Sequence, residues 1–198
     1  MMNIKLKLLS IWTPKFLLKR ELERTSHLTN SYLDRLLKKN GIVSQPEKTF
    51  KGNLEQTRTH MALGHNKRIQ CLIKELGHEK AMEKGKKQMF NAGFELGLEA
   101  RNQLKVETLE DTLAAAKILY NVLGIEFNTE HRQNTIILWV ESCALADHYN
   151  PETCVIMSYA DRGVLKGLNQ DMDMEFVERI TAGAQKCKAC IKYSGQKL

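Results

Sequence analysis

The apolar residues of the first two thirds of the chain recur at intervals of three and four, which is the spacing of one helix face. Glycines follow the ends of these periodic stretches, at Gly41, Gly77 and Gly124, where helices commonly stop. Thr108, with Asp111 in the turn after it, is typical of a helix start. The pattern predicts four helices, over residues 15–39, 54–76, 78–104 and 108–123.

The pattern changes in the last third of the chain. Residues 134–143 are rich in β-branched and aromatic side chains, which is typical of a largely buried strand. Asn150-Pro151 predicts the start of a helix that runs to about residue 168. Residues 174–181 and 187–193 predict two further strands joined as a hairpin. We therefore predict an α+β fold, in which a helical N-terminal part packs on a small antiparallel sheet with one inserted helix.

Two glycines inside the third predicted helix indicate close packing. Gly93 and Gly97 are four residues apart and therefore lie on one helix face. Each costs up to about 1 kcal/mol relative to alanine in a helix. A face without side chains lets another backbone approach closely, so we expect a tight helix contact there.

Positive charge is concentrated in the N-terminal half. The formal net charge of the chain is +7, and residues 1–45 alone carry +6, whereas residues 89–198 carry −4. We therefore divide the chain into a basic amphipathic helical arm (1–45), a linker that includes a helix start (46–60) and an α+β domain (61–198). The arm could pack on its own domain or on a second subunit. Alternatively, its aromatic and basic side chains could contact a partner protein or a membrane surface.

The composition excludes several classes of protein. With 42% hydrophobic and 27% charged residues, the chain can bury a globular core. No apolar run approaches the about 20 residues that span a bilayer, and the N-terminus lacks a secretory cleavage site. Five cysteines, an odd number, favour a reducing compartment, so we expect a cytoplasmic protein. No nucleic-acid-binding motif is present, and we expect no nucleic-acid partner.

Four cysteines lie in the last third of the chain and could form a metal site. Zinc or an iron–sulfur cluster would need all four thiolates. On a regular strand, residues three apart point to opposite faces, so Cys187 and Cys190 would bind one ion only if the strand were bulged. We therefore expect no cofactor and keep the metal site as the less favoured alternative. Its ligands would be Cys143, Cys154, Cys187 and Cys190.

The same cysteines could instead line a reactive pocket. Cys154 would lie in the first turn of its helix, where the helix dipole favours the thiolate, and Asp161 falls on the same stripe. Cys143 ends its strand, with Glu141 two residues before it and His148 five residues after it. If strand pairing holds to its end, Glu141 and Cys143 share one face. Buried cysteines that only fill space are the structural alternative.

Several of these residues form an ordered set of motifs that resembles the L-2-amino-thiazoline-4-carboxylic acid hydrolase family. The resemblance extends from Asn66 to Tyr193. The motifs are Leu76-Gly77 with Ala81, a strand ending in Cys143, Cys154 leading a helix with Asp161 and Gly167-Leu168-Asn169, and Glu178-Arg179 before Gly183 and Cys187. The segment from Asn91 to Gly97, with Gly124 and Cys143, also resembles the vinyl-reductase-type ligand-binding domain of the TRAPP-like fold.

The resemblance implies a hydrolase that opens a small cyclic amidine such as a thiazoline, by adding water at the carbon between nitrogen and sulfur. A carbon–nitrogen or carbon–sulfur bond would break. The implied catalytic residues are Cys143, Cys154, Asp161 and Cys187, and the implied substrate-binding residues are Glu141, His148, Tyr159 and Arg179. The TRAPP-like kinship implies a homodimer. The alternative is a non-enzymatic module that binds or senses a small molecule, with the basic arm contacting a partner.

Overall fold

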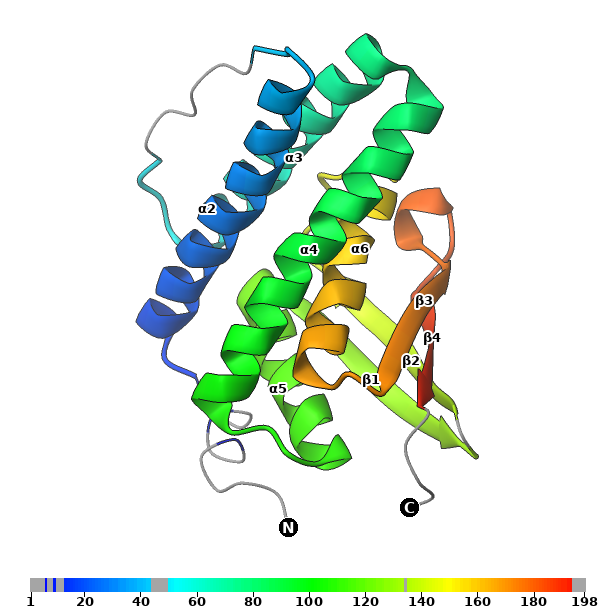
Figure 1. The fold of residues 1–198 in the computed structure, drawn as a ribbon. Helices are drawn as coiled ribbons and strands as arrows, with labels where there is room; N and C mark the ends of the chain where they lie inside the picture. Colours follow the sequence, from blue (N-terminus) through cyan, green and yellow to red (C-terminus); the bar gives the residue numbers. More distant parts are fainter. Residues whose placement is uncertain (1–5, 7–8, 10–12, 44–49, 134, 194–198) are drawn as a thin grey trace.

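The computed structural model describes residues 6, 9, 13–43, 50–133 and 135–193. Trp12, one of the aromatic residues of the predicted arm, and residues 44–49, at the junction of the predicted arm and linker, lie outside the described residues. The elements are α2 (Lys15–Lys39), α3 (Leu54–Leu76), α4 (His78–Leu104), α5 (Leu109–Leu123), β1 (Ile125–Arg132), β2 (Thr135–Cys143), α6 (Pro151–Leu168), β3 (Met172–Glu178), a 3₁₀ turn (Ile180–Ala182) and β4 (Cys187–Tyr193) (Figure 1).

The helix starts follow the local chemistry that the sequence predicts. Asn53 and Thr108 each accept a hydrogen bond from the backbone N–H three residues later, and each forms a reciprocal capping box. Pro151 occupies the first turn of α6 after Asn150. Gly124, at φ 70°, adopts the left-handed conformation that ends α5 and leads the chain directly into β1. All five predicted helices are present.

The sheet is antiparallel, with the strand order β1-β2-β4-β3. The predicted α+β fold is confirmed, with two differences in the strands. β1 was not predicted: it is an edge strand on which only Phe127 is fully buried, so its sequence lacks a clear apolar alternation. The strand predicted over 174–181 instead spans Met172–Glu178, and the 3₁₀ turn follows it.

A bulge at the end of β2 changes which residues face the interior. Phe127 pairs with Val140 and Glu126 with Ser142, so Glu141 is the extra residue between them. Strand alternation therefore does not hold to the end of β2. Cys143 faces the same side as Val140, and Glu141 is exposed. The predicted shared face of Glu141 and Cys143 is wrong for this reason.

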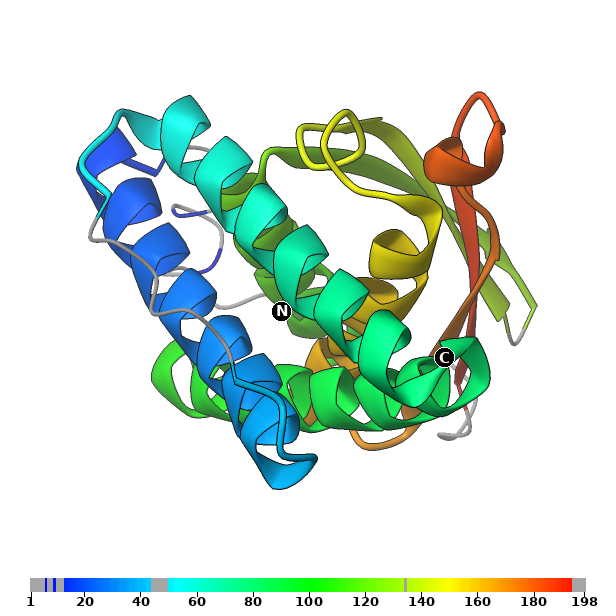
Figure 2. The ribbon, with the colours of Figure 1, turned by 90° about the horizontal axis from the view of Figure 1, so that it is seen from above.

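The helices form two layers, with α6 between α4 and the sheet (Figures 1 and 2). α6 contributes to two parts of the core. Its C-terminal residues Leu165 and Leu168 join α5 and the inner face of the sheet. Its N-terminal residues Ile156 and Met157 join α2, α3 and α4. α6 is therefore the element through which the helical part and the sheet are connected.

α4 and α6 pack with their backbones in contact. A Cβ at Gly93 or Gly97 would lie under 3 Å from backbone atoms of α6, and a Cβ at Gly163 or Gly167 would lie under 3 Å from backbone atoms of α4. The expected tight helix contact at Gly93 and Gly97 is confirmed. Because glycines on both helices lie in this contact, no side chain separates the two backbones there.

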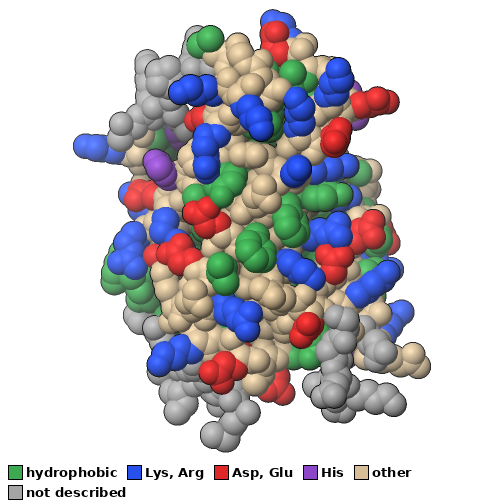
Figure 3. Space-filling model, viewed as in Figure 1, with side chains coloured by type: hydrophobic (Ala, Val, Ile, Leu, Met, Phe, Trp, Pro, Cys, Tyr) green, Lys and Arg blue, Asp and Glu red, His purple; other side chains and the backbone are tan. Residues whose placement is uncertain are grey.

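α2 packs on α3 and α4, which is the first of the alternatives that the sequence left open for the N-terminal arm. Leu22, Leu33 and Leu37 are fully buried in this contact. On the face of the molecule that α4 crosses, basic and acidic side chains are interspersed with apolar ones (Figure 3). Within the described residues, no helix is long and apolar enough to cross a membrane.

We predict that Gly93→Ala destabilises the protein by at least about 2 kcal/mol, because its methyl group would collide with the Ala160 carbonyl on α6. Gly85→Ala on the same helix is the matched control. Its methyl group would meet only the Ile156 side chain, and the gain in helix propensity of about 1 kcal/mol offsets part of the cost. Urea unfolding followed by circular dichroism measures both. Equal losses for the two variants would contradict the tight backbone contact.

Candidate functional site

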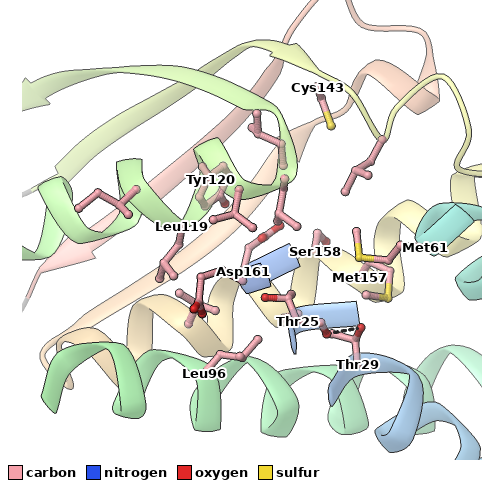
Figure 4. Close-up of a pocket in the computed structure, with 18 of the residues that line it drawn as sticks. Thr25, Thr29, Met61, Leu96, Leu119, Tyr120, Cys143, Met157, Ser158 and Asp161 are labelled. Atoms are coloured by element: carbon pink, nitrogen blue, oxygen red, sulfur yellow. Dashed lines mark hydrogen bonds between the residues drawn. The ribbon is translucent and has the colours of Figure 1, made fainter. Parts of the chain in front are cut away.

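A cavity of about 400 Å³ lies between α2, α4, α5, α6 and the end of the sheet. Its wall is mostly apolar, and a few polar groups converge on it. Figure 4 shows side chains from six elements directed at this space. They include Thr25 and Thr29 of α2, Met61 of α3, Leu96 of α4, Leu119 and Tyr120 of α5, Cys143 of β2, and Met157, Ser158 and Asp161 of α6.

Asp161 is the carboxyl group at the centre of the site. It is surrounded by protein, and its remaining free surface faces the cavity. Burial disfavours the charged form and raises the pKa of Asp161 to about 7, although the nearby Tyr120 hydroxyl and Arg179 guanidinium favour the carboxylate. Near neutral pH this group can therefore either hold or release a proton.

Arg179 is the cation beside Asp161. Its Nη2 donates to the Ser158 hydroxyl at 3.1 Å, and its Nη1 donates to the Phe176 carbonyl at 3.3 Å. The guanidinium also lies over the Phe176 ring, 5.5 Å from the centroid. Its Nε–H is buried and has no hydrogen-bond partner among the described residues. One donor of a charged group is thus left for a ligand.

Two hydroxyl groups in the same wall interact with cavity residues, Tyr120 with Asp161 and Thr181 with Cys154. The hydroxyls of Tyr120 and Thr181 are buried and form no hydrogen bond of normal geometry within the part of the chain that the structure describes. Tyr120 is held by an edge-on contact with Phe127, with ring centroids 5.2 Å apart. Burial raises the pKa of Tyr120 well above its usual value, so its hydroxyl remains protonated at neutral pH.

Three of the four candidate cysteines line the cavity: Cys143, Cys154 and Cys187. Burial raises the pKa of Cys143 to about 11 and also raises the pKa of Cys154 and Cys187. At Cys154, burial raises the pKa although the Thr181 hydroxyl and the Arg179 guanidinium lower it. At neutral pH these residues are thiols, and the Cys187 sulfur accepts a hydrogen bond from the Ile180 N–H at 3.3 Å.

Cys190 lies apart from the other three. Cys190 belongs to β4 and pairs with Ile137 of β2. The buried residues of β4 are Cys187, Ala189 and Ile191, which alternate with Cys190. β4 has no bulge against β2, so Cys190 points to the opposite face of the sheet from Cys187. Among the described residues, no group of three or more His, Cys, Asp or Glu side chains could hold a metal ion. The four-cysteine alternative is therefore wrong.

Of the predicted substrate-binding residues, Arg179 lines the cavity and the other three lie outside it. Glu141 is exposed and forms an ion pair with Lys186. The Nε2 of His148 is 3.0 Å from the Thr59 hydroxyl. Tyr159 lies on the outer side of α6, between the cations of Lys86 and Arg162.

A buried histidine network in the cavity wall was not predicted. The Nδ1 of His65 is 2.8 Å from the Tyr149 hydroxyl, and its Nε2 is 2.9 Å from the Thr29 hydroxyl. Because the Thr29 hydroxyl donates to the Thr25 carbonyl, it accepts from Nε2–H, and Nδ1 accepts from Tyr149. Burial lowers the pKa of His65 to about 3, so the ring is neutral. The only sequence signal was a histidine on the apolar face of a helix.

α2 supplies the wall opposite the sheet, which the sequence also did not indicate. Arg20, Glu21 and Arg24 of α2 line this end of the cavity together with Gln103 of α4. Arg24 forms ion pairs with Glu21 on its own helix and with Glu99 on α4. The Arg24–Glu99 ion pair joins the two helices at this end of the cavity.

The comparisons with known proteins agree with this architecture. The model of the L-2-amino-thiazoline-4-carboxylic acid hydrolase family matches residues 55–191, which is more than half of the chain. The chain belongs to this family. The resemblance that the sequence motifs indicated is thereby confirmed. The family match begins at residue 55, so α2 lies outside it. None of the curated proteins compared with the chain matches it significantly.

Two solved structures share the fold with this family member. A trafficking protein particle complex subunit 3 from Naegleria fowleri, covalently bound to palmitic acid, has a TM-score of 0.55 at 15% identity. The match covers 71% of this chain and 97% of that one. The phenol-responsive sensory domain of the transcription activator PoxR, with phenol, has a TM-score of 0.51 at 13% identity, over 76% of this chain and 78% of that one. The TRAPP-like fold is thereby confirmed.

We predict that Asp161 makes stability pH-dependent between about pH 4 and pH 7. Its pKa is about 7 in the folded chain and near 3.8 when unfolded, so its contribution is complete below pH 4 and is lost as the pH rises through 7. The loss amounts to as much as about 4 kcal/mol. Asp161→Asn should remove this dependence and be the more stable form at pH 8. Urea unfolding of both proteins from pH 4 to pH 8 tests this, and parallel curves would contradict it.

Proposed function

We propose that the chain binds a small, predominantly apolar molecule in the cavity between α2, α4, α5, α6 and the sheet. The observation that carries this proposal is the cavity itself, because about 400 Å³ of mostly apolar space with a few convergent polar groups is typical of ligand sites. The body of the ligand would contact Leu96, Leu119 and Met157. Its polar end would meet Asp161 and Arg179.

The state of the thiols supports binding over covalent catalysis. A cysteine nucleophile needs a lowered pKa and an adjacent base. Here burial raises the pKa of all three cavity thiols, and the cavity histidine, His65, has both ring nitrogens engaged with Tyr149 and Thr29. We infer that the thiols contribute soft apolar surface to the ligand site.

The shared fold is compatible with this proposal. The two solved structures reported above are described as bound to palmitic acid and to phenol. Both molecules combine an apolar body with one oxygen-bearing end. A mostly apolar cavity that also carries the Asp161 carboxyl and the Arg179 guanidinium suits the same general class of ligand in this chain.

Hydrolysis of a small cyclic amidine is the second candidate, and it is favoured by one specific observation. A carboxyl group with a pKa near 7 is suited to exchange a proton during catalysis at neutral pH. Asp161 would take the proton of a water that adds at the carbon between nitrogen and sulfur, and would return it to the leaving atom as the ring opens. The family to which the chain belongs carries the name of this reaction.

We predict that 1-anilinonaphthalene-8-sulfonate binds the protein at one site with a rise in fluorescence. Leu119→Trp should weaken this binding at least tenfold, because the larger side chain fills the cavity. Leu98→Trp is the matched control, because Leu98 is 39% exposed on α4 and does not line the cavity. The affinity of this variant for the dye should be unchanged. Equal affinities for the two variants would contradict binding in the cavity.

We predict for the second candidate that the protein consumes 2-amino-thiazoline-4-carboxylate, measured by chromatography, and that Asp161→Asn lowers kcat at least 100-fold. The profile of kcat against pH should have an inflection at about pH 7, where Asp161 titrates. Asp173→Asn is the control, since Asp173 pairs with Arg162 outside the cavity. Turnover by Asp161→Asn at the rate of the unmodified protein would exclude Asp161 as the acid–base group.

A further inference from the structure

The polar end of the cavity carries more hydrogen-bond donors than its protein partners use. Arg179 Nε–H is buried without a partner among the described residues. The hydroxyls of Tyr120 and Thr181 form no hydrogen bond of normal geometry there, although they interact with Asp161 and Cys154. A buried donor that lacks an acceptor costs about 1–3 kcal/mol, and more for a charged group. The Arg179 donor therefore indicates that an acceptor from outside the chain completes the site.

The charge of the site indicates what kind of acceptor this is. Arg179 donates only to neutral oxygens, those of Ser158 and Phe176, and none of its contacts among the described residues is an ion pair with a carboxylate within 4 Å. A planar guanidinium with a free donor is suited to a carboxylate. The unused positive charge favours an anionic group over a neutral one.

The carboxyl of Asp161 lies in the same wall and would oppose a second negative charge. Two carboxylates sharing one buried site do not both ionise, so one of them retains a proton. A protonated Asp161 would change from an acceptor to a donor and could hydrogen-bond the incoming anion. The groups that face Asp161 from the surrounding elements are Tyr120, Cys143, Tyr149, Cys154, Arg179 and Cys187, of which only Arg179 is charged at neutral pH.

We propose that the cavity captures an apolar monocarboxylate as its anion, with Arg179 and Tyr120 donating to the carboxylate and Asp161 taking up one proton as the ligand binds. This inference rests on the proposed binding function and specifies the ligand class and its proton linkage. One proton moves from solvent to an Asp161 oxygen, and no covalent bond to the ligand forms. Above pH 7 Asp161 is mostly deprotonated before the ligand binds, so binding must take one proton from solvent. The affinity therefore falls about tenfold per pH unit, as the proton concentration does.

Three probes of equal chain length separate charge from apolar contact: octanoate, octanamide and octylamine. Titration calorimetry at pH 6 should give at least tenfold tighter binding of octanoate than of octanamide, and the weakest binding for octylamine. From pH 7.5 to 8.5 octanoate affinity should fall about tenfold. Calorimetry in buffers of different ionisation enthalpy should show uptake of close to one proton per octanoate at pH 8.

Variants assign the effect to the named groups. Arg179→Met should weaken octanoate binding at least tenfold more than octanamide binding, whereas Arg179→Lys keeps the charge and should keep most of the preference. Asp161→Asn should bind octanoate with no pH dependence and no proton uptake. Thermal unfolding of each variant confirms that it is folded before its affinities are compared.

The outcomes separate this inference from the proposed function. If octanamide binds as tightly as octanoate, the cavity binds small molecules but the anion assignment is wrong. Tighter binding of octylamine than of octanoate would indicate that Asp161 binds the polar end of the ligand, and would also overturn the anion assignment. If none of the probes binds, the binding function and the anion assignment both fail. Tighter octanoate binding without proton uptake would retain the role of Arg179 and exclude that of Asp161.

Discussion

The contact between α4 and α6 is the constraint on which the rest of the structure depends. Glycines on both helices bring the two backbones together, so neither helix can rotate or slide without a collision of carbonyl groups. On α6, Ala160 and Gly163 face this contact, and Asp161 therefore points along a neighbouring stripe into the cavity. The same contact fixes α6 against the sheet. The position of the candidate carboxyl, Asp161, thus depends on residues that have almost no side chain.

Local chemistry was sufficient to predict most of the helical part. Capping residues and apolar spacing define each helix within a single stretch of sequence, and Gly93 and Gly97 identified the helix face of the tight contact. The two errors in the predicted strands arose where pairing between strands determines the structure. β1 is a polar edge strand that is stabilised by its register with β2, and the bulge at Glu141 depends on how the two strands meet. Neither feature is encoded in one strand alone.

The candidate site was predictable only in part, for the same reason. Cys154 and Asp161 share a helix stripe, so the sequence could place them together. Tyr120, His65 and the wall formed by α2 come from elements far apart in the chain, and only tertiary packing brings them to Asp161. The pKa of Cys154 was not predictable either, because it depends first on burial, which the sequence does not reveal.

The part of the chain outside the family match contributes to the cavity that the part inside it forms. α2 is joined to α4 by the Arg24–Glu99 ion pair and to α3 by the Thr29–His65 hydrogen bond, and it forms the wall opposite the sheet. Asp161 lines the same cavity, and desolvation by burial is the largest cause of its raised pKa. α2 therefore completes the enclosure of the space into which this carboxyl opens, although it lies outside the family match.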